Sequence, residues 1–407
     1  MRETEEKKKI LIVHNYYQIH GGEDTVVAAE MKLLQEHGHF VLLYQRSNEE
    51  LKKITGAGKL ILPFAEIFSI RTFREVTRLI RENRIDIVHV HNTLHRVSPS
   101  VYYAAFHCHV PVVQTLHNFR LQCPAGTFYR DGHICEDCMK TGIRTAIQYR
   151  CYRGSRLQTF LCVMTTLIHR KLGTYRRLNY ICLTEFNRKK LLELNRNGKQ
   201  MIDPARISVK PNFSWVRQES KEKNRGDYYI YAGRIDALKG MSVLLRAWKM
   251  LGESAPELRI CGSGPQETAV RRYVEKNHLW QVKLMGMLPE EQALSEIGAA
   301  KALILPTQWY EGYPMTMAEA FSMKTPVIAS DLGNAGSLIH EGENGWKFRA
   351  DSPEALAEAV TCCEQLICSG QGEKTLFRAK ADQDGTQPEV NYRMLCEIYD
   401  KAVENNR

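Results

Sequence analysis

The sequence predicts an α/β fold of two domains, each a parallel sheet covered by helices on both faces. At 407 residues, the chain is long enough for two domains with separate cores. Short apolar stretches with strand character alternate with stretches whose apolar residues recur at helical spacing, and the pattern restarts in the second half. Such alternation is typical of parallel strands joined by helices.

The first half opens with a strand, a glycine turn and a helix. Residues Lys8–Tyr16 are predicted to form the strand, and Asp24–His37 the helix. Gly21 and Gly22 between them would let the backbone approach an anionic ligand at the helix start. Further strands are predicted at Val41–Gln45, Ile85–His89, Val110–Leu116 and Tyr180–Leu183.

The second half repeats this order. Tyr228–Ala232 is predicted to be a strand, and Met241–Leu251 the helix that follows it. Because later strands again alternate with helical stretches, a second parallel sheet is expected. These strands are predicted at Leu258–Cys261, Val282–Met285, Ala302–Leu305 and Val327–Ala329.

The domain boundary is predicted near residue 210, where Lys210–Ser214 precedes the polar run Arg217–Arg225. Residues 371–387 are polar and poorly periodic, and Pro388–Val403 has the pattern of an amphipathic helix. We therefore expect a charged tail over residues 1–9 and domains over 10–210 and 211–387. The helix over 388–407 is expected to cross back to the first domain.

Composition excludes several classes of protein. Apolar residues make up 43% of the chain and charged residues 25%, which is the balance of a globular rather than a disordered or fibrous protein. No apolar run is long enough to span a bilayer, and the charged N-terminal residues lead directly into a strand. A cytoplasmic protein is therefore expected.

The net charge of +10 is concentrated in the first half. Between Arg144 and Lys199 there are 13 basic and two acidic residues, interleaved with apolar runs. Such a segment suits anionic lipid, a phosphorylated acceptor or nucleic acid. Ordinary amphipathic helices with solvated basic faces explain the pattern equally well.

Two glutamates separated by seven residues, Glu311 and Glu319, stand between a predicted strand and a predicted helix. Pro314 suits the first turn of that helix because the turn tolerates a residue without an N–H. The N–H groups of Met315, Thr316 and Met317 would then form an anion site. The layout could hold a phosphate between two hydroxyl-binding carboxylates. A solvated loop with surface glutamates is the alternative.

Other predicted strand ends in the second half carry glycines and cations. Arg234 and Lys239 follow the strand Tyr228–Ala232, and two cations beside a backbone turn can clamp a diphosphate. Because ligands bind at the carboxyl ends of parallel strands, these residues and Glu311 are expected at one sheet edge. Ordinary turns and surface cations are the alternative. Glycines of the same group are Gly233, Gly262, Gly264 and Gly286.

Together these motifs resemble those of the retaining GT-B glycosyltransferases of family 4 (group 1). The resemblance extends from about Ile10 to the last helix. One departure is the loop Asp331–Ser337, where many family members carry a glutamate. The resemblance rests on the Gly21-Gly22 loop, Pro211-Asn212, Gly233-Arg234 with Lys239-Gly240, Gly262-x-Gly264-Pro265, Glu311-x7-Glu319 and Asn344-Gly345.

The resemblance implies two Rossmann-like domains facing a central cleft, with the acceptor mainly on the first and the nucleotide sugar mainly on the second. It implies that Arg234 and Lys239 hold the donor diphosphate, Glu319 binds the ribose, and Glu311 contacts the transferred sugar. His117, in Thr115-Leu-His117-Asn118, would reach the donor across the cleft. The expected catalytic residues are thus Glu311, His117, Arg234 and Lys239. The expected donor-binding residues are Gly21, Gly22, Gly233, Gly262, Gly264, Gly286, Pro314, Met315, Thr316 and Glu319.

This chemistry requires no cofactor. Breaking a sugar–phosphate bond builds negative charge on the leaving diphosphate, which fixed cations and helix-end amides stabilise. Catalysis is therefore expected without a divalent metal. The one Asp-x-Asp in the sequence, Asp382 to Asp384, lies in the polar stretch rather than after a strand and is not expected to bind metal. We assign no general base.

Four cysteines in the first half form a separate feature. Cys123, Cys135, Cys138 and Cys151 fall within an insertion over residues 120–152 and include a close C-x2-C pair. Reduced thiols at this spacing suit a tetrahedral structural zinc ion, although unligated thiols explain them equally well. The segment also resembles an insertion found in a subset of the family, where it would order a loop beside His117.

The expected function is transfer of a hexose-type sugar from a UDP- or GDP-linked donor to a cell-envelope, polysaccharide or lipid-linked acceptor. The enzyme is expected to be peripheral at the inner, cytoplasmic face of the membrane. A two-domain nucleotide-sugar epimerase is one alternative, and it would convert its donor without an acceptor. A noncatalytic nucleic-acid-binding protein with a zinc knuckle is another. The chain lacks the aromatic-studded basic strands of common RNA modules, so no nucleic acid is expected as partner.

Overall fold

The computed structural model describes residues 7–17, 21–53, 63–196, 198–215, 225–368 and 385–406. The first six residues of the predicted tail, most of the polar run after residue 216, and Asp382 to Asp384 lie outside the described residues. By its contacts the chain divides into two compact units. The first unit comprises residues 1–128, 136–210 and 391–407, and the second comprises 129–135 and 211–390.

The first unit contains a six-stranded sheet in which all neighbouring strands are parallel, in the order β2-β1-β3-β4-β7-β8. The direction of strand addition reverses between β1 and β3, and ligands bind at such a switch point in open parallel sheets. The strands are β1 Lys9–Tyr16, β2 Phe40–Ser47, β3 Ile87–Val90, β4 Val112–Leu116, β7 Asn179–Cys182 and β8 Ile207–Val209.

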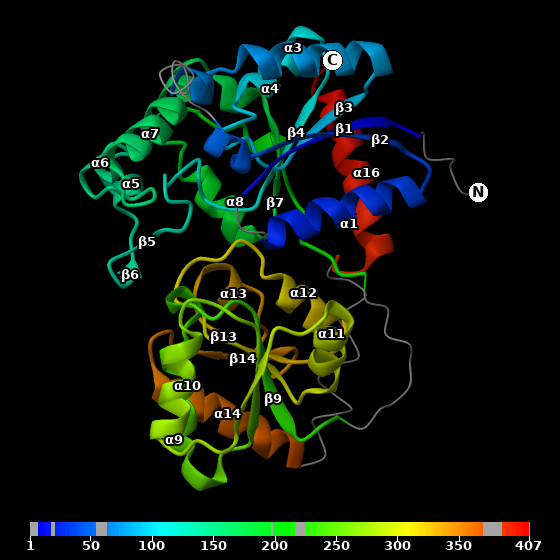
Figure 1. Cartoon of the computed structure of the whole chain (residues 1–407). Helices are drawn as coiled ribbons and strands as arrows, with labels where there is room; N and C mark the ends of the chain where they lie inside the picture. Colours follow the sequence, from blue (N-terminus) through cyan, green and yellow to red (C-terminus); the bar gives the residue numbers. More distant parts are fainter. Residues whose placement is uncertain are drawn as a thin grey trace. The chain divides into compact units, whose positions relative to one another are not determined.

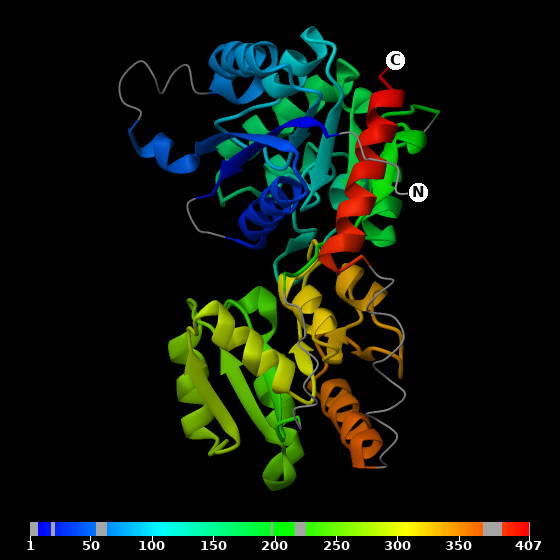
Figure 2. The same cartoon turned by 90° about the vertical axis from the view of Figure 1, so that its right-hand side faces the viewer.

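Helices cover both faces of the first sheet, with α3 and α4 on one face and α1 and α16 on the other (Figures 1 and 2). The central strand β1 is buried from both sides, since Ile10 to Val13 have no exposed surface. The helices are α1 Gly22–Glu36, α3 Ile70–Asn83, α4 Ser100–His107, α5 Asp137–Lys140, α6 Thr145–Gln148, α7 Arg156–Lys171, α8 Glu185–Leu192 and α16 Pro388–Glu404. Short 3-10 turns lie at Asn48–Lys53, Thr174–Arg177 and Pro204–Arg206.

The second unit has its own six-stranded parallel sheet, in the order β11-β10-β9-β12-β13-β14. This is the doubly wound Rossmann order, and its switch point lies between β9 and β12. The strands are β9 Tyr228–Ala232, β10 Glu257–Cys261, β11 Val282–Gly286, β12 Leu303–Leu305, β13 Val327–Ser330 and β14 Gly345–Phe348. A small antiparallel hairpin, β5 Tyr129–Arg130 and β6 His133–Ile134, is grouped with this unit.

Successive residues of β9 supply two separate cores because side chains alternate across a strand. Tyr229 packs in a cluster with Trp248 of α9, and Tyr228 and Ile230 pack in another with Met317 of α12. The predicted α/β fold with parallel sheets is therefore confirmed. The helices are α9 Met241–Leu251, α10 Glu267–Lys276, α11 Glu290–Ala299, α12 Met315–Ser322, α13 Gly333–Ser337 and α14 Pro353–Cys368, with 3-10 turns at Ala237–Lys239 and Gly252–Ser254.

No helix in the described ranges combines the length and apolar character needed to cross a lipid bilayer.

Candidate functional site

An ion pair stands at the switch point of the second sheet. Lys239 follows β9 and Glu311 follows β12, and Lys239 Nζ donates to Glu311 Oε2 at 2.7 Å. The Glu311 side chain is 6% exposed and that of Lys239 is 21% exposed. The other carboxylate oxygen, Glu311 Oε1, is buried and has no hydrogen-bond partner among the described residues. The structure thus brings together two predicted site residues, Lys239 and Glu311, and leaves Glu311 Oε1 able to accept a further hydrogen bond.

Glycines allow the strand-end turns to approach one another closely. Gly262 has φ +141°, and a Cβ there would lie 1.9 Å from the carbonyl oxygen of Gly233. Its N–H donates to Gly286 O at 2.7 Å, and the N–H of Gly233 donates to Cys261 O at 2.9 Å. A side chain at Gly264 would likewise collide with Ile235 O. The turns after β9, β10 and β11 therefore form one packed edge, where only glycine fits at the contact.

Asp236 organises the loop that carries both cations. Its side chain accepts from the backbone N–H of Lys239 at 3.1 Å and so starts the 3-10 turn. Arg234 Nε also donates to Asp236, at 2.5 Å. The Arg234 side chain is 53% exposed, so it can move toward a ligand, whereas Asp236 is largely buried and keeps the loop in place.

The helix after Glu311 begins as predicted, with one difference. Pro314 is the N-cap and α12 starts at Met315. The N–H groups of Met315 and Thr316 have no acceptor among the described residues, but Met317 N–H donates to Pro314 O at 3.1 Å. The expectation of a third outward donor at Met317 is therefore wrong, because the proline carbonyl closes the first turn. Two donors remain for an anion.

Glu319 lies one turn into α12 and is largely removed from water. Burial, with a smaller effect of Glu290, raises the pKa of Glu319 to about 7. A carboxyl group that titrates near neutrality changes its ability to accept hydrogen bonds over the physiological range.

Asn334 is a supporting residue that the sequence did not reveal. It is fully buried in α13, within the loop that departs from the family pattern, and its Nδ2 donates to the carbonyls of Glu311 and Gly312. An asparagine in a glycine-rich loop carries no signal for such a contact. It fixes the backbone that presents the Glu311 carboxylate.

His117 follows β4 in the first unit and is part of a buried histidine group. His117 Nε2 lies 2.9 Å from His91 Nδ1, and the two rings are stacked with centroids 5.2 Å apart. Burial lowers the pKa of His117 to about 3, so the ring is neutral near pH 7. His91 Nε2 in turn faces Glu30 at 3.5 Å. A neutral imidazole can exchange hydrogen bonds but adds no positive charge.

The Gly21-Gly22 turn opens α1, also in the first unit. Gly21 is the N-cap, and its N–H donates to Asp24 Oδ2 at 3.0 Å, while Asp24 Oδ1 lies 2.7 Å from His14 Nε2. The helix start is thus closed by its own aspartate. Gly22 stays exposed. Burial, followed by the charge of Asp24, raises the pKa of the adjacent Glu23 to about 8.

The cysteine-rich segment contains a polarised thiol pair. The Cys138 side chain hydrogen-bonds to Cys123 and, with the backbone N–H groups nearby, outweighs burial and lowers the pKa of Cys123 to about 6. Cys138 and Cys151 pack against one small apolar cluster that contains Ile143. Cys135 follows the β5–β6 hairpin. A thiolate is the form of cysteine that ligates metal, so the donor chemistry of Cys123 fits zinc.

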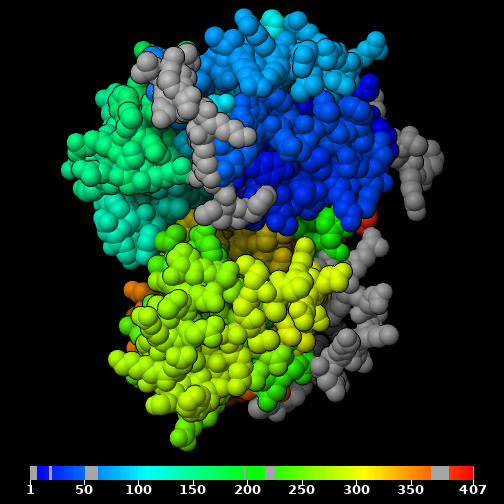
Figure 3. Space-filling model, in the orientation of Figure 1, coloured from blue at the N-terminus to red at the C-terminus, as the bar shows by residue number. Residues whose placement is uncertain are grey.

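The basic segment lies on the surface of the first unit, on the flank coloured teal to green in Figure 3. Exposed apolar side chains accompany its cations: Leu157 is 65% exposed and Phe160 44% exposed. Its exposed arginines on and before α7 are Arg144, Arg150, Arg153 and Arg156.

Solved structures with the same architecture define the class of protein. A glycosyltransferase from Rickettsia africae matches with a TM-score of 0.68 and 17% identity over 98% of this chain and 99% of that one. The Anabaena protein HepE, solved in complex with UDP, matches with a TM-score of 0.63 and 15% identity over 96% and 98% of the two chains. These likenesses establish the GT-B glycosyltransferase fold.

Sequence comparison identifies the family. Residues 20–161 match the model of glycosyltransferase family 4, and residues 214–365 match that of the glycosyl transferases group 1. The chain belongs to this family of glycosyltransferases, as its motifs predicted. The amylovoran biosynthesis glycosyltransferase AmsK of Erwinia amylovora is 28% identical over 188 residues, which is 43% of this chain and 44% of that protein. The matches span less than half the length of the curated relatives.

Proposed function

We propose that this protein is a retaining, metal-independent glycosyltransferase that moves a hexose-type sugar from a UDP- or GDP-linked donor to a polysaccharide, cell-envelope or lipid-linked acceptor. In this proposal Lys239 and Arg234 bind the diphosphate, Glu319 binds the ribose, and Glu311 contacts the transferred sugar. His117 contacts the donor from the first unit, and the glycine turns after β9, β10 and β11 line the nucleotide.

The observation that carries the proposal is the Lys239–Glu311 pair at the switch point of a Rossmann sheet. Lys239 contacts Glu311, which precedes α12 by four residues, and the first two N–H groups of α12 have no described acceptor. A cation and helix-end donors from these two loops suit a leaving diphosphate, whose charge they would stabilise. The unpartnered oxygen of Glu311 suits a sugar hydroxyl, since a buried carboxylate oxygen is stabilised by a donor. Because cations and amides supply the charge stabilisation, the reaction as proposed needs no divalent ion.

Support for the donor comes from the UDP complex of HepE, and support for a polysaccharide acceptor comes from the amylovoran relative. The exposed arginines on and before α7, with Leu157 and Phe160, suit adsorption to an anionic membrane surface, because apolar side chains add buried area to the electrostatic attraction. We therefore propose that the enzyme acts at the cytoplasmic face of a membrane.

The proposal also assigns a structural zinc ion to Cys123, Cys135, Cys138 and Cys151, motivated by their spacing and by the lowered pKa of the Cys123 thiol. The ion would order the segment next to His117 and take no part in transfer. Elemental analysis of the purified protein tests this: one zinc per chain is expected, falling in Cys138→Ser. A metal-free protein with unchanged thermal stability would contradict it.

A screen of nucleotide sugars tests the proposed function directly. At a hundredfold excess over its Kd, a true donor stabilises the protein by about 2.7 kcal/mol, which appears as a rise in melting temperature. The best donor is then incubated with and without glycan acceptors, and the products are separated. Sugar transferred with retained anomeric configuration is expected. Conversion of the donor to another nucleotide sugar without acceptor would instead identify an epimerase.

A further inference from the structure

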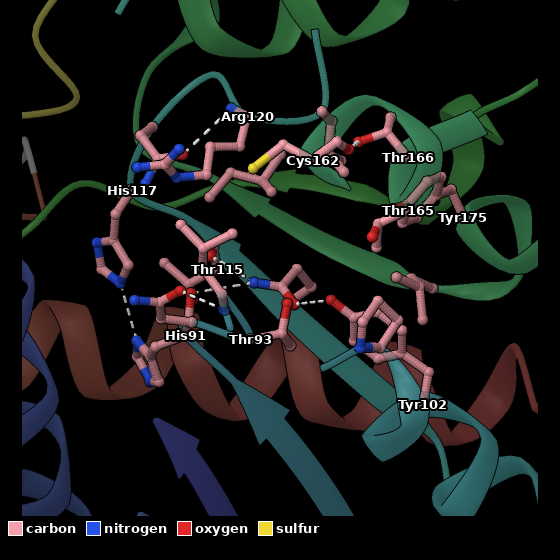
Figure 4. A pocket seen from close by; sticks show the side chains of 18 of the residues that line it. His91, Thr93, Tyr102, Thr115, His117, Arg120, Cys162, Thr165, Thr166 and Tyr175 are labelled. Atoms are coloured by element: carbon pink, nitrogen blue, oxygen red, sulfur yellow. Dashed lines mark hydrogen bonds between the residues drawn. The ribbon is translucent and has the colours of Figure 1, made fainter. Parts of the chain in front are cut away.

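A cavity of about 110 Å³ opens within the first unit, at the carboxyl ends of β3 and β4, beside α7 and the amino end of β7 (Figure 4). Ligands of parallel sheets bind at the carboxyl ends of the strands. A water molecule needs roughly 10–15 Å³ of such space, so the cavity has room for several waters or for part of a sugar-sized ligand. Its wall includes Glu66, His95, His117, Arg120, Cys162 and Thr165.

Arg120 is a cation on this wall that interacts with Tyr17 and with the more distant charge of Glu23 but forms no ion pair with a described carboxylate. Its Nη1 donates to Pro124 O at 2.9 Å, but its Nε is buried and has no hydrogen-bond acceptor among the described residues. None of the described carboxylates forms an ion pair with it. The hydroxyl of Thr165, on the same wall, is also buried without a partner. Unpaired buried donors are costly, so both groups call for a partner in the cavity, either a bound ligand or water.

Aromatic rings hold the Arg120 guanidinium in place. Its central carbon lies 5.0 Å from the ring centroid of Tyr152 and 6.0 Å from that of Tyr17. The Tyr152 hydroxyl lies 2.7 Å from His95 Nε2, and His95 Nδ1 lies 3.1 Å from Glu66. The acid on the cavity wall is thus engaged by histidine and does not neutralise the arginine.

The backbone at His95 is left-handed, with φ +76°, in a region where histidine occurs more often than most other non-glycine residues. In this conformation the imidazole contacts both the Tyr152 hydroxyl and Glu66. The ring over which the Arg120 guanidinium lies is therefore itself held by a hydrogen bond.

We propose that this cavity binds an anionic group of the acceptor, either a carboxylate or a phosphate, through the guanidinium of Arg120 and the hydroxyl of Thr165. The inference rests on the proposed function and adds the chemical class of the acceptor. A guanidinium matches both oxyanions because its N–H groups form parallel hydrogen bonds with two oxygens. Neutral sugars lack this group and would leave Arg120 unpaired.

Titration calorimetry on the full chain tests the proposal with three probes: glucuronic acid, glucose 6-phosphate and glucose. We expect one or both acids to bind and glucose not to bind. Binding of the acid should be about tenfold or more weaker in Arg120→Gln, since a charged hydrogen bond is lost. Arg120→Lys should bind at an intermediate strength. The two acids separate a carboxylate source from a phosphate source.

Thr165→Val is a second variant that keeps the shape of the cavity and should also weaken acid binding, and it serves if Arg120→Gln does not fold. The affinity for UDP and GDP is the control. It should not change in any variant, so a loss of nucleotide binding would assign Arg120 to the donor instead. Equal binding of acids by wild type and Arg120→Gln, or acids binding no better than glucose, would overturn the proposal and leave a water-filled cavity.

If wild type binds an acid through Arg120 but neither UDP nor GDP, the proposed glycosyl transfer fails while the anion site stands. If wild type binds UDP or GDP but neither acid, the proposed anion site fails while the proposed glycosyl transfer stands.

Discussion

Two lysine–glutamate pairs, one in each unit, have the same 2.7 Å separation but different surroundings. Lys210 and Glu30 in the first unit are 0% and 1% exposed, whereas Lys239 and Glu311 in the second are 21% and 6% exposed. Lys210 also donates to Asn391 of α16 at 2.8 Å. The other oxygen of each glutamate is buried and accepts no hydrogen bond from a described residue, but that of Glu30 lies 3.5 and 3.8 Å from ring nitrogens of His91 and His89.

The difference separates a structural pair from a binding pair. Burial alone would raise the pKa of Glu30, but Lys210, together with His89 and His117, outweighs burial and lowers the pKa below its usual value. The two hydrogen bonds of Lys210 join three elements, α1, the end of β8 and α16, in a site from which water is excluded. The pair in the second unit joins two strand ends and leaves one carboxylate oxygen and one lysine face for a ligand. We call Lys210–Glu30 the sealed pair, which stabilises the fold, and Lys239–Glu311 the open pair, which is accessible to a ligand.

The largest expected effect follows from breaking the sealed pair. Lys210→Met should lower the free energy of unfolding of the first unit by about 3–5 kcal/mol, because it leaves the Glu30 carboxylate buried without its cation. All five tryptophans lie in residues 215–346 of the second unit, so fluorescence does not report this loss. Hydrogen exchange followed by mass spectrometry of β1 and α16 peptides measures it.

The double variant Glu30→Leu/Lys210→Met is the control for that experiment, since replacing both charges avoids the stranded carboxylate and should cost less than the sum of the single changes. Unchanged exchange in Lys210→Met would show that the pair has no structural role.

A smaller effect, on activity rather than stability, is expected from the open pair. Lys239→Met and Glu311→Gln should each reduce transfer by about 10²- to 10³-fold through loss of transition-state stabilisation. Stability should fall by less in Lys239→Met than in Lys210→Met, because the Lys239 side chain is 21% exposed and the pair is less completely removed from water. Steady-state kinetics and tryptophan fluorescence in urea measure the two quantities.

Lys301→Met is the matched control in the same unit. Lys301 donates to Glu364 at 2.9 Å. It lies just before the amino end of β12, at the opposite end of the strand from the candidate site. It should leave transfer unchanged. Equal losses of activity in Lys301→Met and Lys239→Met would refute the assignment of the open pair.

The smallest effect concerns pH. Since the pKa of Glu319 is raised to about 7, its ionisation in the folded protein is disfavoured, and stability falls as pH rises from about 4.5 to 7 and is level above. A ribose hydroxyl donates best to the ionised form. Nucleotide affinity should therefore increase by about tenfold from pH 6 to 8 and stay flat in Glu319→Gln. Calorimetry with UDP or GDP at several pH values measures it, and a flat wild-type profile would contradict this role.

Much of the fold was predictable because local pattern and tertiary structure agree. The predicted strand Tyr228–Ala232 and helix Met241–Leu251 coincide with β9 and α9, and the last predicted helix ends one residue short of α16. The helix after Gly21 begins two residues earlier than predicted because Asp24 caps it. The three-residue β8 and the β5–β6 hairpin were not predicted, because strands this short have too few residues to show an alternating apolar pattern.

The candidate site was predictable where residues follow strands directly. Glu311, Lys239 and the glycine turns were expected at one sheet edge because parallel strands end together. Asn334 and Arg120 could not be predicted from the sequence. Asn334 acts through hydrogen bonds to residues distant in the chain, and Arg120 is distinguished by a buried N–H without an acceptor. Neither feature leaves a pattern in the sequence. Whether a lysine–glutamate pair is sealed or open likewise depends on burial that sequence spacing does not encode.

The position of α16 also constrains how the protein is made. Residues 391–404 of this helix supply Asn391 and the buried Leu395 and Tyr399 to the first unit, yet the ribosome synthesises them after the whole second unit. The N-terminal unit therefore cannot complete its core during its own synthesis, although domains commonly fold in order of emergence. Until α16 has been synthesised, Lys210 has no Asn391, and the incomplete unit is a natural client for chaperones.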